Sequence, residues 1–236
     1  MRLPALVEGI FLQRTSRFSA LVLVREKKEK VYVPNSGRMQ ELLTAGGRVY
    51  LAESPKAERT TKYDLLLVDF HGTLVSVDSR VPNLIIMEAL KKGNLPFWQG
   101  QELTDLKKEA TFGKSRFDFK VSVDAGRGRW EETFIEAKSV TLVKGNTAMF
   151  PDAPTERGSK HLQELVQAVR QGLRGMVIFV VQRPDAETFA PNAETDPVFA
   201  ENLQLAAECG VELHAFRCVV QKTQIVLERE IPVLGG

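Results

Sequence analysis

The chain has 236 residues, of which 43% are hydrophobic and 26% are charged, and its formal net charge at pH 7 is +2. This composition is ordinary for a globular protein and excludes the fibrous and disordered classes. No apolar run approaches the roughly 18–20 residues that a membrane-spanning helix needs. The two cysteines, Cys209 and Cys218, lack the spacing of a disulfide framework or a metal pair. We therefore expect a cytoplasmic protein that does not bind membranes, built as one large domain or two small ones.

The first 80 residues predict a small β domain. Short apolar runs bounded by turn residues predict strands at Leu6–Leu12, Ser19–Arg25, Val31–Val33, Arg48–Glu53, Asp64–Phe70 and Thr73–Val77. One helix is predicted at Gly37–Leu43, with Ser36 as its N-cap. Short strands with a single helix after the third are typical of a small closed barrel, so we expect an OB-fold-like domain over residues 1–80.

Basic side chains cluster in the loops of this expected barrel. Arg14 and Arg17 lie beside the aromatic Phe18, and three lysines follow within Lys27–Lys30. OB barrels bind single strands with basic grooves and with aromatic side chains on which bases stack. We therefore take Arg14, Arg17 and Phe18 as candidate nucleic-acid-binding residues. The alternative is an ordinary solvated surface.

A second domain is expected over residues 81–236. Pro82 opens a predicted helix at Leu84–Lys92, and Gly93 ends it. Three strands, a longer helix, a buried strand, another helix and two last strands follow. Their expected ranges are Lys107–Phe112, Arg116–Val123, Glu131–Lys138, Gly158–Gln171, Met176–Val181, Pro197–Cys209, Val211–Val220 and Gln224–Glu230. The fold class is therefore α/β (α+β), with a central mixed sheet flanked by helices.

Two of these strands each carry one acidic residue among apolar neighbours, Asp118 and Glu136. A glycine-rich turn that folds about Arg127 would place the two acids directly opposite each other, with Cβ atoms about 4.5–5.5 Å apart. Strand side chains alternate with a period of two, so Lys138 points to the same face as Glu136. Converging carboxylates are unfavourable in a half-buried sheet unless a divalent cation neutralises them. We expect Mg²⁺ or Mn²⁺ there; the alternative is a hairpin edge with surface charges.

An acid followed by Glu-x-Lys resembles the signature of the PD-(D/E)xK nuclease superfamily, and the order of elements matches that core. The resemblance implies that Asp118 and Glu136 bind the metal ion. Lys138 would then position or deprotonate the attacking water, or stabilise charge on the phosphate. Metal-bound water and a polarised phosphate would carry the cleavage.

Three further residues are candidates around this centre. Glu88 lies within the helix that precedes the sheet and is either an additional metal ligand or a surface acid. Lys160 and His161 lie near the start of the long helix, where a helix N-terminus favours phosphate. We take Lys160 as a candidate nucleic-acid contact and His161 as a candidate catalytic residue, with a helix cap or a packed core histidine as its alternative.

Longer stretches of the chain resemble the sugar fermentation stimulation protein A (SfsA) family. They are Arg14–Phe18, Pro34–Gly37, Pro82–Asn83, Gly113–Asp118, Glu136–Lys138, Phe150–Ala153, Arg157–Leu162 and Asp196–Phe199. The resemblance covers nearly the whole chain and implies an OB-like domain followed by a nuclease-like domain. It also implies a DNA-binding protein linked to the regulation of sugar (maltose) metabolism. One departure is Ala137, where the family commonly has valine.

Three functions remain open from the sequence. The first is a DNA-binding protein with a Mg²⁺-dependent nuclease-type centre. The second is a non-catalytic DNA-binding regulator whose acidic centre binds metal without cleaving. The third is a hydrolase of a small phosphorylated substrate, for which a basic front domain would be of little use.

Overall fold

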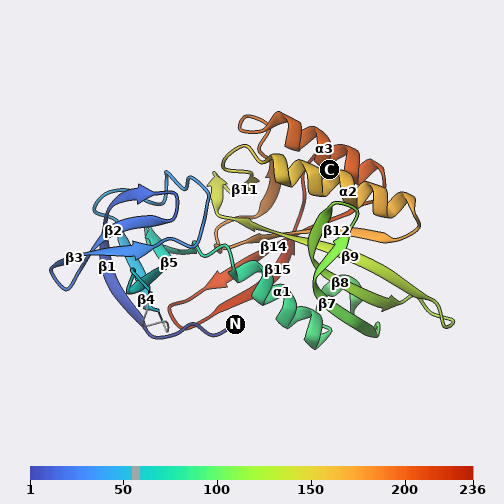
Figure 1. Cartoon of the computed structure of the whole chain (residues 1–236), viewed down its shortest axis with the longest axis horizontal. Helices are drawn as coiled ribbons and strands as arrows, with labels where there is room; N and C mark the ends of the chain where they lie inside the picture. The colour runs from blue at the N-terminus through green and yellow to red at the C-terminus, as the bar shows by residue number, and fades with distance from the viewer. Residues whose placement is uncertain (55–58, 236) are drawn as a thin grey trace.

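The computed structural model describes residues 1–54 and 59–235, and it has two parts arranged along its long axis (Figure 1). The N-terminal part is all β. The larger part carries a mixed sheet with helices on both faces. The last strand of the first part ends at residue 76 and the first helix of the second begins at residue 81.

The first part is a closed barrel. Its strands are β1 (Leu6–Ser16), β2 (Ser19–Val24), β3 (Lys27–Tyr32), β4 (Arg48–Glu53), β5 (Tyr63–Phe70) and β6 (Thr73–Ser76). They are ordered β3-β2-β1-β4-β5-β6, and an additional parallel pairing of Tyr32 with Asp64 joins β3 to β5 and closes the barrel. Alternate residues of the strands fill the interior, among them Phe11, Val22 and Leu65. The barrel expected from the sequence is therefore present.

The prediction of a helix at Gly37–Leu43 is wrong, because these residues form a loop of turns and bends. The Arg14 guanidinium donates to the backbone carbonyls of Asn35, Gly37 and Arg38. In a helix that starts at Gly37, the last two carbonyls would accept from backbone N–H groups four residues later. Met39 adopts the left-handed conformation with φ +47°. A side chain far away in the sequence therefore overrides the local N-cap pattern.

The second part is built on a six-stranded sheet in the order β15-β14-β12-β9-β8-β7. Its elements are α1 (Val81–Lys92), a short 3₁₀ turn (Pro96–Trp98), β7 (Leu103–Phe112), β8 (Ser115–Asp124), β9 (Trp130–Val140), α2 (Glu156–Arg170), β12 (Arg174–Val181), α3 (Pro197–Glu208), β14 (Glu212–Val220) and β15 (Ile225–Ile231). Strand β12 runs parallel to both β9 and β14, and the remaining pairs are antiparallel. The sheet is therefore mixed, as predicted.

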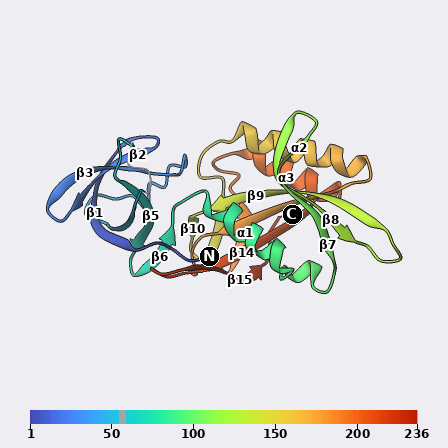
Figure 2. The ribbon, with the colours of Figure 1, turned by 60° about the horizontal axis from the view of Figure 1, so that its bottom comes forward.

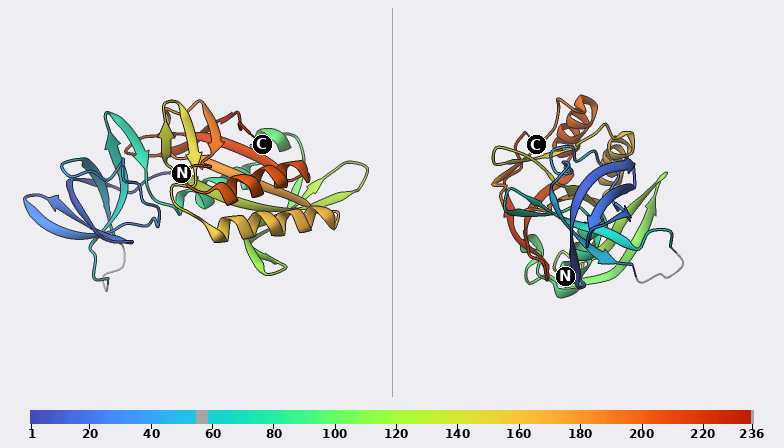
Figure 3. Two further views of the ribbon diagram at one scale, coloured as in Figure 1. Left: turned by 90° about the horizontal axis from the view of Figure 1, so that it is seen from above. Right: turned by 90° about the vertical axis from the view of Figure 1, so that its left-hand side faces the viewer.

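Helices cover both faces of this sheet. Met176, Ile178 and Val180 of β12 pack into the core under α1, whereas Val177 and Phe179 pack into the core under α2 and α3. Figure 3 shows α2 and α3 side by side across the sheet. Burial on both faces explains why β12 is a continuous apolar run in the sequence.

A small second sheet was not predicted. It contains β10 (Leu142–Lys144), β11 (Thr147–Phe150) and β13 (Thr188–Pro191), with β11 between the other two and parallel to β13. These strands have only three or four residues each. Such short strands lack the periodicity that identifies a strand in a sequence.

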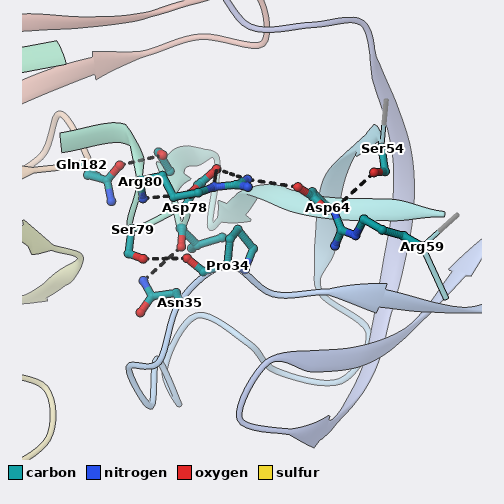
Figure 4. A network of polar contacts seen from close by, with 11 residues as sticks. Pro34, Asn35, Ser54, Arg59, Asp64, Asp78, Ser79, Arg80 and Gln182 are labelled. Carbon is teal, nitrogen blue, oxygen red and sulfur yellow. Dashed lines mark hydrogen bonds and ion pairs between the residues drawn. The ribbon is translucent and has the colours of Figure 1, made fainter. Parts of the chain in front are cut away.

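The segment between β6 and α1 fastens the barrel to the second domain (Figure 4). The Ser76 hydroxyl donates to Gln182 Oε1 at 2.9 Å, and Gln182 donates in turn to Ser139 at 2.8 Å. Arg80 pairs with Asp64 of the barrel at 3.0 Å and with Asp78 at 2.7 Å. Because these contacts lie next to the start of α1, they also fix where that helix begins.

Candidate functional site

The β8–β9 hairpin has the register that the sequence predicts. Lys120 pairs with Phe134 and Phe119 with Ile135, so the hairpin folds about Arg127. Arg127 has a φ of +55° and lies between two glycines that also have positive φ, as a tight turn there requires. The regular pairing ends at Phe119 and Ile135, one residue short of Asp118 and Glu136, so these two acids are not a directly paired position of the ladder.

The strand changes direction at Asp118. Phe117 packs into the core under α2 and Phe119 into the core under α1, although residues two apart normally point to the same face. The regular β8–β9 pairing ends at Phe119, and the N–H of Ala137 donates to Asp118 Oδ2 at 2.9 Å instead. Asn83 of α1 donates to Oδ1 at 2.6 Å. Both oxygens of Asp118 therefore have donors.

The Glu136 carboxylate is only 5% exposed and is held from one side. Lys138 Nζ donates to Oε1 at 2.7 Å, and His161 Nδ1 lies 2.6 Å from the same oxygen. The other oxygen, Oε2, is buried and has no hydrogen-bond partner among residues 1–54 and 59–235. Buried polar atoms normally have a partner, so Oε2 is the orphan of this site.

The two carboxylates differ in proton affinity. Burial and the nearby Glu136 charge raise the pKa of Asp118 above its ordinary value, against the hydrogen bonds from Ala137 and Asn83. Burial also acts to raise the pKa of Glu136, but the Lys138 charge and the hydrogen bonds from His161 and Lys138 outweigh it and leave that pKa lowered. The site therefore holds one stabilised carboxylate beside one destabilised carboxylate.

The structure thus brings four of the predicted residues together: Asp118, Glu136, Lys138 and His161. It adds Asn83, which the sequence marks only as part of the Pro82–Asn83 stretch. A polar residue in the first turn of the helix before the sheet was the available signal. The contact of Asn83 with Asp118 depends on which turn of α1 faces Asp118, and the packing of α1 on the sheet determines that turn.

Family models match the chain in two segments. Residues 12–77 match the SfsA N-terminal OB domain, and residues 80–224 match the sugar fermentation stimulation protein RE domain. A sugar fermentation stimulation protein homolog from Desulforamulus reducens is 46% identical over 231 residues, which are 98% of this chain and 93% of that relative. Another from Clostridium tetani is 41% identical over 224 residues, 95% of each chain. The chain belongs to the sugar fermentation stimulation protein (SfsA) family.

A solved structure from the SfsA family has the same fold throughout. The structure of Pyrococcus furiosus SfsA in complex with Ca²⁺ superposes with a TM-score of 0.88 at 34% identity and covers 99% of this chain and 97% of that one. The match confirms the predicted family and the predicted order of an OB domain followed by a mixed-sheet domain.

Glu88, which we predicted as a further metal ligand, is not brought to this cluster. It binds the N-terminal amine of Met1 at 3.0 Å and Lys92 at 2.6 Å, one helical turn further along α1. Both contacts lower the pKa of Glu88 to about 2, chiefly through the hydrogen bond from Lys92. Asn83, and not Glu88, is the α1 side chain that reaches Asp118.

Arg14 is engaged in the barrel, and the structure leaves it no donor for a nucleic acid. Its five N–H groups donate to five carbonyls, those of Ser16, Arg17, Asn35, Gly37 and Arg38. A guanidinium has five donors in total. Arg14 is therefore a structural residue that holds the loop at 34–43 against the β1–β2 turn.

The other predicted contacts are exposed. Arg17 lies over the ring of Phe18 at 5.5 Å from its centroid, and Phe18 is 44% exposed. Lys160 lies on the first turns of α2 and donates to the Lys114 carbonyl at 3.3 Å. Arg17 and Phe18 lie on the barrel, where Phe18 also stacks on Tyr32, and Lys160 lies next to His161 on α2.

The residues of the cluster fit a hard divalent cation held by few protein ligands. Asp118 and Glu136 supply oxygens, and Oε2 of Glu136 is the buried acceptor without a donor. The described residues include no group of three or more His, Cys, Asp and Glu side chains placed to hold a metal ion. Mg²⁺ commonly binds through one or two carboxylates, with waters and substrate phosphate completing its shell.

In the part of the chain that the structure describes, no helix is long and apolar enough to cross a membrane.

Proposed function

We propose that this chain is a metal-dependent phosphodiesterase that cleaves DNA at the Asp118–Glu136 cluster. The observation that carries the proposal is the Glu136 carboxylate, whose Oε2 is buried without a described partner while Lys138 and His161 both hold Oε1. Leaving a buried acceptor unpaired costs about 1–3 kcal/mol, and more for a charged group. A cation bound between the two carboxylates removes that destabilisation.

The cation we propose is Mg²⁺ or Mn²⁺, held by Asp118 and Glu136. The Ca²⁺ complex of the Pyrococcus furiosus relative supports a hard divalent cation in this family. A cation of this kind polarises a phosphate oxygen and acidifies a bound water.

Lys138 supplies a fixed positive charge to the same site. Its ammonium lies 2.7 Å from Glu136, and its side chain is largely buried. A charge that is already in place stabilises the negative charge that develops on the phosphate oxygens during cleavage. Its second effect is to keep Glu136 ionised, since the pKa of Glu136 is lowered by that charge.

His161 acts as a positioning residue for Glu136. The Arg157 Nε donates to His161 Nε2 at 3.4 Å, which leaves Nδ1 as the ring nitrogen that donates to Glu136 Oε1. Two donors on Oε1 orient the carboxylate so that Oε2 is left for the cation. This is the arrangement by which outer hydrogen bonds orient a metal ligand.

The barrel supplies a second contact with the DNA. A cavity of about 520 Å³ lies between the β1–β2 turn and the loop at 34–43, lined by Ser16, Arg17, Ser36, Arg38 and Gln40 among others. Phe18 lies beside Arg17 and is exposed for stacking. A basic cavity with an adjacent aromatic side chain favours single-stranded nucleic acid. Arg17, Phe18 and Lys160 remain the proposed nucleic-acid contacts, in a cytoplasmic protein.

A second candidate is a non-catalytic DNA-binding regulator of sugar metabolism, in keeping with the family's name. One observation favours it: among the described residues, the cluster gathers only two acidic side chains. In that case the metal ion would order the cluster and contact phosphate without cleavage.

A cleavage assay separates these candidates. Labelled single-stranded, duplex and branched DNA would be incubated with the protein and Mg²⁺, Mn²⁺ or EDTA. We expect metal-dependent cleavage that Lys138→Ala abolishes while leaving DNA binding largely intact. Cleavage that persists in Lys138→Ala would exclude this centre, and DNA binding without any cleavage would favour the regulator.

Metal binding tests the part of His161 independently of activity. Thermal unfolding with and without Mn²⁺ should show metal-induced stabilisation in the wild type, because the ion binds the folded state. His161→Ala should weaken metal affinity by about 10–100-fold, the usual effect of losing an outer hydrogen bond to a ligand. His161→Asn, whose amide retains a donor near Nδ1, should recover most of it. If His161→Ala and His161→Asn bind the metal ion with equal affinity, the hydrogen-bond donor at this position has no effect on metal binding. His161 would then be only a packed core residue.

A further inference from the structure

The tip of the β8–β9 hairpin carries an exposed aromatic side chain. Trp130 begins β9, opposite Asp124, and is 46% exposed, whereas the chain's other tryptophan, Trp98, is 1% exposed. Figures 1 and 2 show this tip at the end of the molecule opposite the barrel. About half of the Trp130 surface is therefore open to solvent at the tip, where an aromatic side chain can meet a ligand.

Two arginines lie just before this tryptophan in the turn. Arg127 and Arg129 are exposed, and their side chains make no hydrogen bond or ion pair with the residues that the structure describes. The acidic residues nearby are neutralised: Glu131 pairs with Arg174 at 3.5 Å and Glu132 with Lys120 at 2.5 Å.

The remaining acid of the turn is also occupied. Asp124 Oδ1 accepts a hydrogen bond at 2.7 Å from the N–H of Gly126, which shapes the turn. In the part of the chain that the structure describes, the tip therefore presents two arginine charges without an ion-pair partner, one aspartate charge and one aromatic face. The charge of the tip is positive on balance, which suits phosphates beside an unpaired base.

We propose that the tip formed by Arg127, Arg129 and Trp130 binds single-stranded nucleic acid, with Trp130 stacking on a base and the two arginines contacting phosphates. The inference deepens the proposed function by naming single strands as the substrate class and the tip as a contact beyond the cleavage centre. A duplex hides the faces of its bases in the stack, so an exposed aromatic face discriminates in favour of unpaired nucleotides.

The position of the tip determines how many nucleotides lie between this contact and the cleavage centre. Glu136 lies six positions after Trp130 along β9, which at about 3.4 Å per residue is roughly 20 Å. A stacked strand with about 3.4 Å per nucleotide covers that span with roughly six nucleotides. Figure 2 shows the tip and the barrel at opposite ends of the molecule, and Glu136 lies within β9, the strand that leads away from the tip. A bound strand would therefore be held on both sides of the scissile phosphate.

Fluorescence anisotropy with labelled oligonucleotides tests this directly, in EDTA so that nothing is cleaved. Trp130→Ala should weaken binding of a 20-nucleotide single strand by about tenfold, since stacking on an aromatic side chain is worth about 1–3 kcal/mol per base. Trp130→Phe should recover most of the loss. The Arg127→Ala/Arg129→Ala variant should also weaken binding and flatten its salt dependence by one to two phosphate contacts. Binding of a blunt duplex of equal length should change little in Trp130→Ala.

A matched control removes one arginine and one exposed apolar side chain from the helices instead, as Arg170→Ala/Leu205→Ala. It should bind like the wild type. Binding at the tip can also be followed by the fluorescence of Trp130, because a stacked base should quench it. The Trp130→Phe variant should lose this quenching signal. If the wild type binds single strands and Trp130→Ala binds them equally well, the tip has no part in recognition and the proposed function stands. If the wild type binds no nucleic acid, both proposals fail.

Discussion

The ionised Asp118 side chain is unfavourable in the metal-free fold, and this gives a prediction at the scale of one residue. Burial and the Glu136 charge raise its pKa, so the charged form is less stable in the folded chain than in the unfolded one. That destabilisation is absent below the ordinary pKa of an aspartate, about 3.9. It develops as the pH rises through the raised pKa and persists at neutral pH.

Asp118→Asn should therefore raise the melting temperature at pH 7 in EDTA, and the gain should shrink as the pH falls toward 4. Asn83 can turn its amide to suit the new partner, and the Ala137 N–H keeps an acceptor. Addition of Mn²⁺ should stabilise the wild type and not the variant. A melting temperature that is unchanged or lowered by Asp118→Asn at pH 7 would contradict this account of the site.

At the scale of elements, the barrel offers a comparison between two neighbouring arginines. Arg14 donates all five of its N–H groups to carbonyls of the β1–β2 turn and of the loop at 34–43. Arg17 contacts the ring of Phe18 and lines the cavity. Arg14→Ala should cost about 2–4 kcal/mol of stability, because hydrogen bonds from a charged donor contribute about 1.5–3 kcal/mol each and several are lost together. Arg17→Ala should leave stability within about 0.5 kcal/mol and weaken DNA binding instead.

Urea unfolding and DNA anisotropy on both variants check this division. An Arg14→Ala protein as stable as the wild type would return Arg14 to the nucleic-acid surface that the sequence suggested. An Arg17→Ala protein with unchanged DNA affinity would remove Arg17 from that surface.

The elements also show what the sequence could predict and what it could not. The β8–β9 register followed from the glycine turn about Arg127 and the period of two, which are local properties. The loop at 34–43 did not follow, because its conformation depends on Arg14, and the contact of Asn83 with Asp118 depends on how α1 packs on the sheet. Glu88 failed as a candidate for the same reason, since its partner is the chain's first residue. Local signals thus located the acids, and tertiary packing selected their neighbours.

At the scale of the whole molecule, buried polar contacts join the barrel to the second domain (Figure 4). Gln182 is fully buried, accepts from the Ser76 hydroxyl and donates to Ser139, the residue after Lys138. Its backbone N–H and carbonyl are bonded as well, to Val140 and Ser76. A fully satisfied buried network fixes one relative orientation of the parts that it joins. The wild type should therefore unfold in a single cooperative transition, with calorimetric and van't Hoff enthalpies that agree.

Gln182→Ala should disrupt this single cooperative unfolding transition. It leaves the buried Ser76 hydroxyl and the half-buried Ser139 hydroxyl without their partner, at a cost of about 1–3 kcal/mol for the buried group. Because the lost contacts lie between the domains, we expect the calorimetric transition to broaden or to separate into two, with the barrel interior and the core under α2 and α3 each retained. Thr147→Ala, which removes a hydroxyl contact with Thr188 inside the second domain, serves as the control and should keep one transition. A single sharp transition in Gln182→Ala, merely shifted to lower temperature, would show that the apolar packing alone makes the two parts one cooperative unit.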